Sequence, residues 1–234
     1  MPVTAGPIYP GIKDGLVFAI DPANKDSWAG PTSDTVNSLV SYNFFTGSIY
    51  NDTSGSYGDN ESFAFDGTDD YIKIGDVRDF DNGDLSVSIW TNVSSTRTST
   101  VYAFSNCGST SYAGFDIAIK TNEQVRLRRN TRTQINDPGW VSIGLTEDTW
   151  NNISFTYNES TNTLKLFLNG VLKNTTTGTS QSAAVSRVLT IGSYIGTISL
   201  WNGNIGPAQI YNRTLSASEV LENYNRLKGR FGLS

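Results

Sequence analysis

Three carboxylates stand close together in one short stretch of the chain, between two runs of alternating apolar residues. Asp66, Asp69 and Asp70 could hold a calcium ion, because this hard cation prefers carboxylate and carbonyl oxygens. Asp21, in another loop-like position, is a further ligand candidate. The competing interpretation is the tip of a β-hairpin, because the Asp66-Gly67 pair suits the positive backbone angles of such a turn. The hairpin is the favoured prediction, and calcium stays open as the alternative.

Histidine is absent from the chain, and cysteine occurs once, as Cys107. Ser-His-Asp and Cys-His mechanisms need an imidazole base, so both are excluded, as are zinc sites built on imidazole. Glycosidases can place acids at alternate positions of one strand, so that they share a face. The Glu-x-Asp-x-Glu type of spacing does not occur, and the glutamates are scattered at Glu61, Glu123, Glu147, Glu159, Glu219 and Glu222. We therefore expect no catalytic residue, and a carbohydrate-active hydrolase or lyase is the weakest alternative.

Several aromatic residues lie in segments rich in Gly, Pro, Asn or Ser. Trp28, Trp140, Tyr194 and Trp201, with Asn202 beside the last of them, form this group. Aromatic rings stack on sugars, while amide and carboxylate groups bind sugar hydroxyls. We interpret these residues as candidates for glycan binding, and packing against neighbouring surfaces is the competing interpretation.

Four arginines form a basic stripe around one predicted strand. They are Arg126, Arg128, Arg129 and Arg132. A charged, solvated strand edge is the simplest explanation, because charge protects edges from pairing. An interface with another subunit or an anionic partner is the alternative, and Tyr9 in the proline-rich N-terminal arm is a further interface candidate. Nucleic acid is disfavoured as a partner, because the net charge is −5.

The pattern of the chain predicts an all-β domain. Residues 85–91 alternate cleanly, with Leu85, Val87 and Ile89 on one face and Trp90 on the other. Asn169-Gly170 between two apolar runs predicts a tight hairpin. Strands without intervening helices favour a two-sheet antiparallel sandwich.

One short helix is expected near the C-terminus. Ser216 and Glu219 form a capping box before an amphipathic run, and Gly229 is expected just past the helix end. We expect an extended arm over residues 1–12, one sandwich domain over residues 13–229 and a tail over residues 230–234. The arm and the tail are the expected attachments to neighbouring subunits.

Seven segments, taken in order, carry a family resemblance: Gly15–Asp21, Phe63–Tyr71, Leu85–Trp90, Trp150–Tyr157, Leu164–Leu172, Leu189–Gly192 and Gly203–Glu219. This set resembles the LamG-like branch of the concanavalin A-like lectin/glucanase superfamily. The resemblance implies a jelly-roll sandwich, with calcium often bound at its edge in relatives. It implies no required cofactor, and calcium remains the alternative.

Two further segments, Ile20–Trp28 and Glu222–Gly232, resemble LamG-like proteins of tailed bacteriophage particles, notably marine ones. The N-terminal residues lack the basic and apolar regions of a signal peptide, and no apolar run is long enough to insert in a membrane. We therefore expect a non-catalytic virion protein, a head decoration or a tail or fibre component, whose partners are other virion proteins, its own copies and a cell-surface glycan. The alternative is a calcium-assisted lectin module that binds carbohydrate. Asn151 and Asn152 depart from the family, which often has two histidines there.

Overall fold

The computed structural model describes residues 11–30, 33–40, 45–50, 62–75, 83–106, 114–131, 134–180 and 188–234. Tyr9, Arg132 and most of the predicted N-terminal arm lie outside these ranges, so the interpretations placed on them stay predictions. No helix in the described part of the chain is long and apolar enough to cross a membrane.

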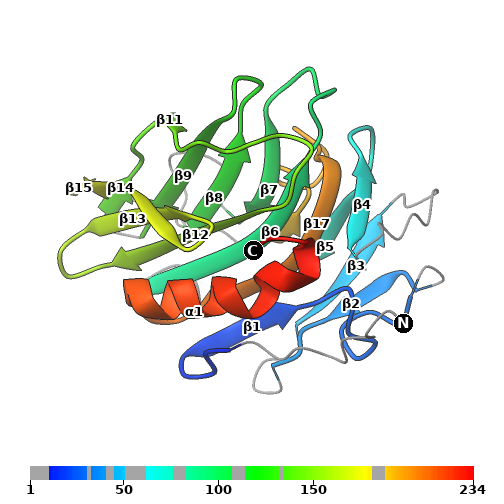
Figure 1. The fold of residues 1–234 in the computed structure, drawn as a ribbon, viewed down its shortest axis with the longest axis horizontal. Coiled ribbons are helices and arrows are strands. Elements are labelled where there is room, and N and C mark those ends of the chain that lie inside the picture. The colour runs from blue at the N-terminus through cyan, green and yellow to red at the C-terminus, as the bar shows by residue number, and fades with distance from the viewer. Residues whose placement is uncertain are drawn as a thin grey trace.

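The described strands form two antiparallel sheets packed as a sandwich (Figure 1), which confirms the predicted fold. The seven-stranded sheet has, in spatial order, β1 (Leu16–Ile20), β17 (Asn202–Tyr211), β6 (Leu85–Val93), β12 (Asn151–Asn158), β13 (Thr163–Leu168) and β14 (Val171–Thr177), with β4 (Phe63–Asp66) also pairing with β17. The ten-stranded sheet has β15 (Thr179–Ser180), β10 (Gln134–Asn136), β9 (Gln124–Asn130), β8 (Gly114–Ile119), β7 (Val101–Ser105), β16 (Leu189–Ile191), β5 (Tyr71–Ile74), β3 (Thr46–Tyr50) and β2 (Thr35–Asn37), with β11 (Val141–Ser142) beside β9.

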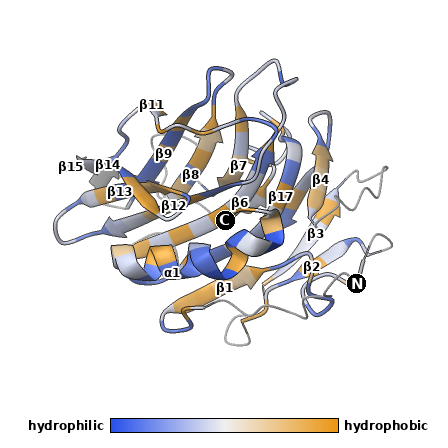
Figure 2. Ribbon diagram, in the orientation of Figure 1, coloured by the Kyte–Doolittle hydropathy of each residue, from blue (hydrophilic) through white to orange (hydrophobic). Residues whose placement is uncertain are grey.

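The core lies between the sheets, because alternate residues of each strand point inward. In β6 the side chains of Leu85, Val87 and Ile89 join this core, each 1 % exposed or less. Figure 2 shows β1 as almost wholly hydrophobic, whereas β9 also carries hydrophilic residues. The Asn169-Gly170 hairpin is confirmed, with φ angles of 51° and 76° at its two turn residues.

The opposite face of the seven-stranded sheet is covered by the helix α1 (Ala217–Leu227) and the 3-10 helix η2 (Lys228–Phe231) (Figure 1). The predicted capping box is confirmed: the Ser216 N–H donates to Glu219 Oε2 at 2.8 Å, and the Glu219 N–H donates to Ser216 Oγ at 3.3 Å. The helix α1 ends at Leu227, so Gly229 lies just past its end as predicted, and η2 then continues the chain to Gly232, whose φ is 71°.

The first residues of the predicted tail, 230–234, pack on the domain. The Phe231 ring is 5 % exposed and packs against Trp90 and Trp150, with centroid distances of 4.4 and 4.3 Å. Arg230 Nη1 lies 2.7 Å from Asp21 Oδ1, in an ion pair that joins the C-terminal segment to the end of β1. Residues 230 and 231 are therefore part of the folded domain.

The acidic stretch is not a hairpin, contrary to the favoured prediction. β4 pairs with β17 in the seven-stranded sheet, whereas β5 pairs with β3 and β16 in the ten-stranded sheet. The chain therefore crosses between the sheets from Asp66 to Tyr71. Alternation alone could not show this, because Phe65 before the crossing and Ile72 after it both point into the shared core.

Candidate functional site

The outer face of the ten-stranded sheet carries polar and aromatic side chains that could bind a ligand. Two cross-strand rows run over β7, β8 and β9 on this face. One row pairs Tyr102 with Ala118, and Ala118 with Arg126. The other pairs Ser105 with Asp116, and Asp116 with Arg128. Their neighbours in sequence point into the core, because strand residues alternate between faces.

The row with Asp116 is a buried charge pair. Asp116 is 1 % exposed and Arg128 4 % exposed. Asp116 accepts a hydrogen bond from the Ser105 hydroxyl at 2.5 Å, while its second oxygen is bound to Arg128 Nη2. Burial raises the pKa of the Asp116 carboxyl, although the Arg128 guanidinium and the Ser105 hydroxyl act against this rise. Both oxygens of Asp116 are thus engaged inside the protein.

The row with Arg126 reaches solvent. Arg126 binds Asp137 through two hydrogen bonds, one of them from Nε to Oδ1 at 3.0 Å, and their side chains are 24 % and 17 % exposed. The Gly139 N–H also donates to Asp137 Oδ1, at 3.0 Å. Burial alone would raise the pKa of Asp137, but these bonds from Arg126 and Gly139 hold it below its usual value. The carboxylate is therefore ionised and fixed in orientation at neutral pH.

Aromatic rings lie near this pair. The Tyr194 ring packs on Tyr102 at a centroid distance of 4.6 Å, and Lys120 Nζ lies 5.6 Å from the Trp140 ring centre. Burial, together with the nearby Asp116, raises the pKa of Tyr102 to about 12, so its hydroxyl is protonated at neutral pH.

We call this group the aromatic face. It combines half-buried rings, which can stack on a sugar, with a fixed Arg–Asp pair, which can donate to and accept from hydroxyl groups. Its members are Tyr102, Lys120, Arg126, Asp137, Trp140 and Tyr194.

Two of the predicted glycan-binding tryptophans do not belong to this face. Trp201 is fully buried in the core, and Trp28 is 4 % exposed, packs on Phe63 at 4.8 Å and donates from Nε1 to the Ser33 carbonyl. Their ring faces are covered, so the prediction that they stack on a glycan is wrong. Asn202 lies elsewhere as well, since its Nδ2 donates to the Asp66 carbonyl at 3.3 Å.

The predicted arginine stripe is also divided by the structure. Arg128 is buried against Asp116, and Arg129 is fully buried on the core side, with its guanidinium 5.5 Å from the Tyr157 ring centre. Neither can form an interface, so only Arg126 keeps a partly exposed guanidinium among the described members of the stripe. The alternation of strand residues separates Arg128 from Arg129, which adjacent positions in the sequence conceal.

The acidic loop at the edge of the sandwich brings three of the four predicted metal ligands together. Carboxylate oxygens of Asp66, Asp69 and Asp70 lie within 4.8 Å of one another. Asp70 Oδ2 accepts from the Asp66 N–H at 2.9 Å, and Asp66 Oδ1 accepts from the Thr68 N–H at 2.7 Å. Asp21 does not join them, because its carboxylate is engaged by Arg230, and its prediction as a ligand of this site is wrong.

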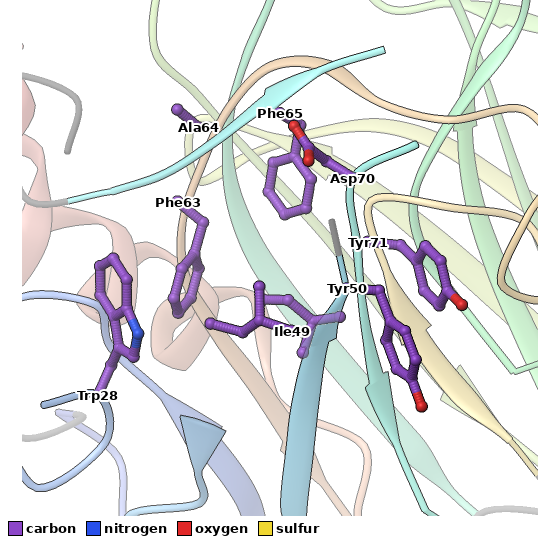
Figure 3. A pocket seen from close by; sticks show the side chains of 9 residues that line it. Trp28, Ile49, Tyr50, Phe63, Ala64, Phe65, Asp70 and Tyr71 are labelled. Carbon is purple, nitrogen blue, oxygen red and sulfur yellow. The ribbon is translucent and has the colours of Figure 1, made fainter. Parts of the chain in front are cut away.

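A cleft with an empty volume of about 300 Å³, which includes open solvent, lies next to this loop (Figure 3). Core side chains from both sheets form its wall, and Tyr50 and Tyr71 lie to one side as a flat stack with ring centres 4.6 Å apart. The cleft is the open end of the core and is lined by Trp28, Ile49, Tyr50, Phe63, Ala64, Phe65, Asp70, Tyr71 and Ile72.

Comparison with known proteins identifies the family. A family model described as the concanavalin A-like lectin/glucanases superfamily matches residues 66–221, about two thirds of the chain. The chain belongs to this superfamily. The match agrees with the jelly-roll sandwich and with the resemblance noted in the sequence. No curated protein sequence matches the chain.

Solved structures of low sequence identity share the fold of this superfamily member. The receptor-binding domain of botulinum neurotoxin mosaic serotype C/D has a TM-score of 0.68 and 15 % identity over 92 % of this chain. The binding domain of botulinum neurotoxin DC in complex with SialylT has a TM-score of 0.65 and 14 % identity over 92 %. The chain spans 51 % and 52 % of these two proteins, so it corresponds to about half of each.

Proposed function

We propose that this chain is a non-catalytic binding module that holds a glycan on the aromatic face. The observation that carries the proposal is a set of half-buried rings, Tyr102, Tyr194 and Trp140, near the partly exposed Arg126–Asp137 pair. An apolar ring surface beside a fixed donor and acceptor is the arrangement that sugar recognition requires. Structural neighbours in complex with SialylT or dependent on gangliosides agree with this ligand class.

The arrangement of the carboxylates supports a binding role over hydrolysis. Glycoside hydrolysis uses two carboxyl groups beside the substrate, one of them protonated. Asp116 is 1 % exposed, with both oxygens bound to protein groups. Asp137 is held ionised by Arg126, because its pKa lies below its usual value. Neither group is poised to donate a proton to a glycosidic oxygen.

Binding to a glycan array followed by titration calorimetry tests the proposal. Trp140→Ala should weaken binding of any glycan selected on the array by about tenfold or more, roughly 1.4 kcal/mol. Leu221→Ala removes a side chain that is 41 % exposed on α1, on the opposite side of the sandwich, and should leave the affinity unchanged. Equal affinity of the two variants would refute the proposed face, and an array without any bound glycan would refute the proposed ligand class.

A calcium ion at the acidic loop is a second candidate function. The three clustered carboxylates fit the chemistry of calcium, which takes six to eight oxygen ligands and would draw the remainder from carbonyl groups and water. Such an ion would stabilise the crossing between the sheets rather than act at the aromatic face. Calcium titration of the protein and of Asp69→Asn tests this candidate, and an identical response of both would refute it.

We also propose that the module works on the surface of a virus particle. The support is the resemblance of the segments Ile20–Trp28 and Glu222–Gly232 to tailed-phage proteins. The ion pair between Asp21 and Arg230 joins these same two segments. Mass spectrometry of purified particles of the encoding virus tests the proposal, and a protein inventory without this chain would contradict it.

A further inference from the structure

A small hairpin stands at the margin of the aromatic face. The Tyr194 N–H donates to the Ile198 carbonyl at 2.8 Å, and the two residues form an antiparallel bridge. The Gly196 N–H donates to Ser193 Oγ at 3.2 Å, which closes the turn. We call residues 194–198 the bridge hairpin.

The bridge hairpin is fixed to the sheet at two points. The Tyr194 ring packs on Tyr102, and the Tyr102 N–H donates to the Ser199 carbonyl at 3.1 Å. A β-carbon added at Gly196 would lie 3.7 Å from Tyr71, so the tip of the hairpin passes beside that ring. The hairpin therefore has a defined position next to the rings proposed to bind sugar.

Two isoleucines on this hairpin are exposed to solvent. Ile195 is 46 % exposed and Ile198 53 % exposed. Ile195 has a φ of 50°, a left-handed conformation that is unfavourable for a β-branched residue and is typically retained at functional sites. Among the other exposed large hydrophobic side chains of the described chain, Tyr50 stacks on Tyr71 beside the hairpin tip, whereas Val171, Leu172 and Leu221 lie elsewhere.

Ile198 extends the ring surface of the aromatic face. Partners in an antiparallel bridge project their side chains to the same side, so Ile198 lies beside Tyr194. Two side chains form a patch far smaller than the roughly 800 Å² that each partner buries in a stable protein interface. The patch therefore suits a substituent of a small ligand better than a protein surface.

We propose that the bound glycan carries a methyl group that rests on Ile198, as an N-acetyl or a 6-deoxy sugar would. This inference rests on the proposed glycan function and names the ligand class at that site. A hydroxyl group placed on the isoleucine would lose water without gaining a hydrogen bond, whereas a methyl group would gain from burial.

Two matched ligand pairs test the inference by titration calorimetry. Chitotriose carries acetamido groups where cellotriose carries hydroxyl groups. L-fucose carries a methyl group on carbon 5 where L-galactose carries a hydroxymethyl group. The methyl-bearing member of at least one pair should bind about fourfold to tenfold more tightly. The pair that shows the preference distinguishes the N-acetyl from the 6-deoxy source.

Ile198→Ser should abolish this preference, whereas the matched control Val171→Ser, 55 % exposed on β14, should retain it. Equal binding within both pairs, or no binding of any of the four sugars, overturns the inference. A preference that survives Ile198→Ser overturns it as well. If Trp140→Ala abolishes binding but neither methyl-bearing sugar is preferred, the proposed methyl-bearing ligand class is refuted, whereas the proposal that the aromatic face binds a glycan is not. If Trp140→Ala leaves binding unchanged, the proposed function itself fails.

Discussion

The packing of Phe231 gives a quantitative prediction for the C-terminal segment. Replacing Phe231 with alanine removes a ring that is 5 % exposed and contacts both Trp90 and Trp150. The loss of a buried phenylalanine, with the cavity that remains, should lower the free energy of unfolding by about 3–5 kcal/mol. For a domain of this size the melting temperature should fall by roughly 2–4 °C per kcal/mol.

Urea unfolding followed by tryptophan fluorescence measures this effect, because both contacted rings are tryptophans. The matched control is Leu221→Ala on α1, whose side chain is 41 % exposed and which should change the free energy of unfolding by less than about 0.5 kcal/mol. A loss below about 1 kcal/mol for Phe231→Ala would show that the segment is detached in solution. That result would contradict the packing of Phe231 between the two tryptophans.

Three further outcomes are expected. Asp116→Ala leaves Arg128 buried without its carboxylate partner and should lower the free energy of unfolding, measured with urea, by about 3–5 kcal/mol. The double variant Asp116→Ala with Arg128→Met should recover most of this loss. Equal losses in the single and the double variant would contradict the pairing of Asp116 with Arg128. The hydrogen bond from Arg213, with that from the Ser216 N–H, lowers the pKa of Glu219 from 4.5 to about 2. The folded-state pKa lies below the unfolded one, so this contribution is present above about pH 4.5 and is lost as the pH falls toward 2. It should amount to about 1 kcal/mol after solvent screening, and Glu219→Gln should remove this pH dependence. Calcium at about 100 times its dissociation constant should raise the melting temperature by roughly 5–10 °C, and Asp69→Asn should abolish the rise.

Sequence motifs predicted correctly the elements whose conformation depends on residues close together in the chain. The capping box at Ser216 and Glu219 and the turn at Asn169-Gly170 each depend on residues close in sequence, and both are confirmed. The alternation in β6 likewise identified which side chains enter the core. The crossing after Asp66 was missed, because the partner of β4 is β17, more than 130 residues further along the chain.

The candidate site was only partly predictable. Trp140 and Tyr194 were singled out because they lie in loop-like segments, but the same signal wrongly selected Trp28 and Trp201, whose burial depends on tertiary packing. Tyr102 was missed, because it lies in the mostly apolar strand Val101–Ser105, whose residue types predict a fully buried strand. The position of its side chain on the outer face of the sheet depends on which strands pair with β7. This strand order is not encoded by the residues close to Tyr102 in sequence.

Mapping the bound glycan by NMR tests the central claim most directly. Amide and indole signals would be assigned in the free protein and followed during titration with the glycan selected on the array. The account predicts that the largest shifts fall on Tyr102, Trp140 and Tyr194, with the Trp140 indole N–H among them. Shifts confined to the acidic loop around Asp69, with the aromatic face unchanged, would contradict it.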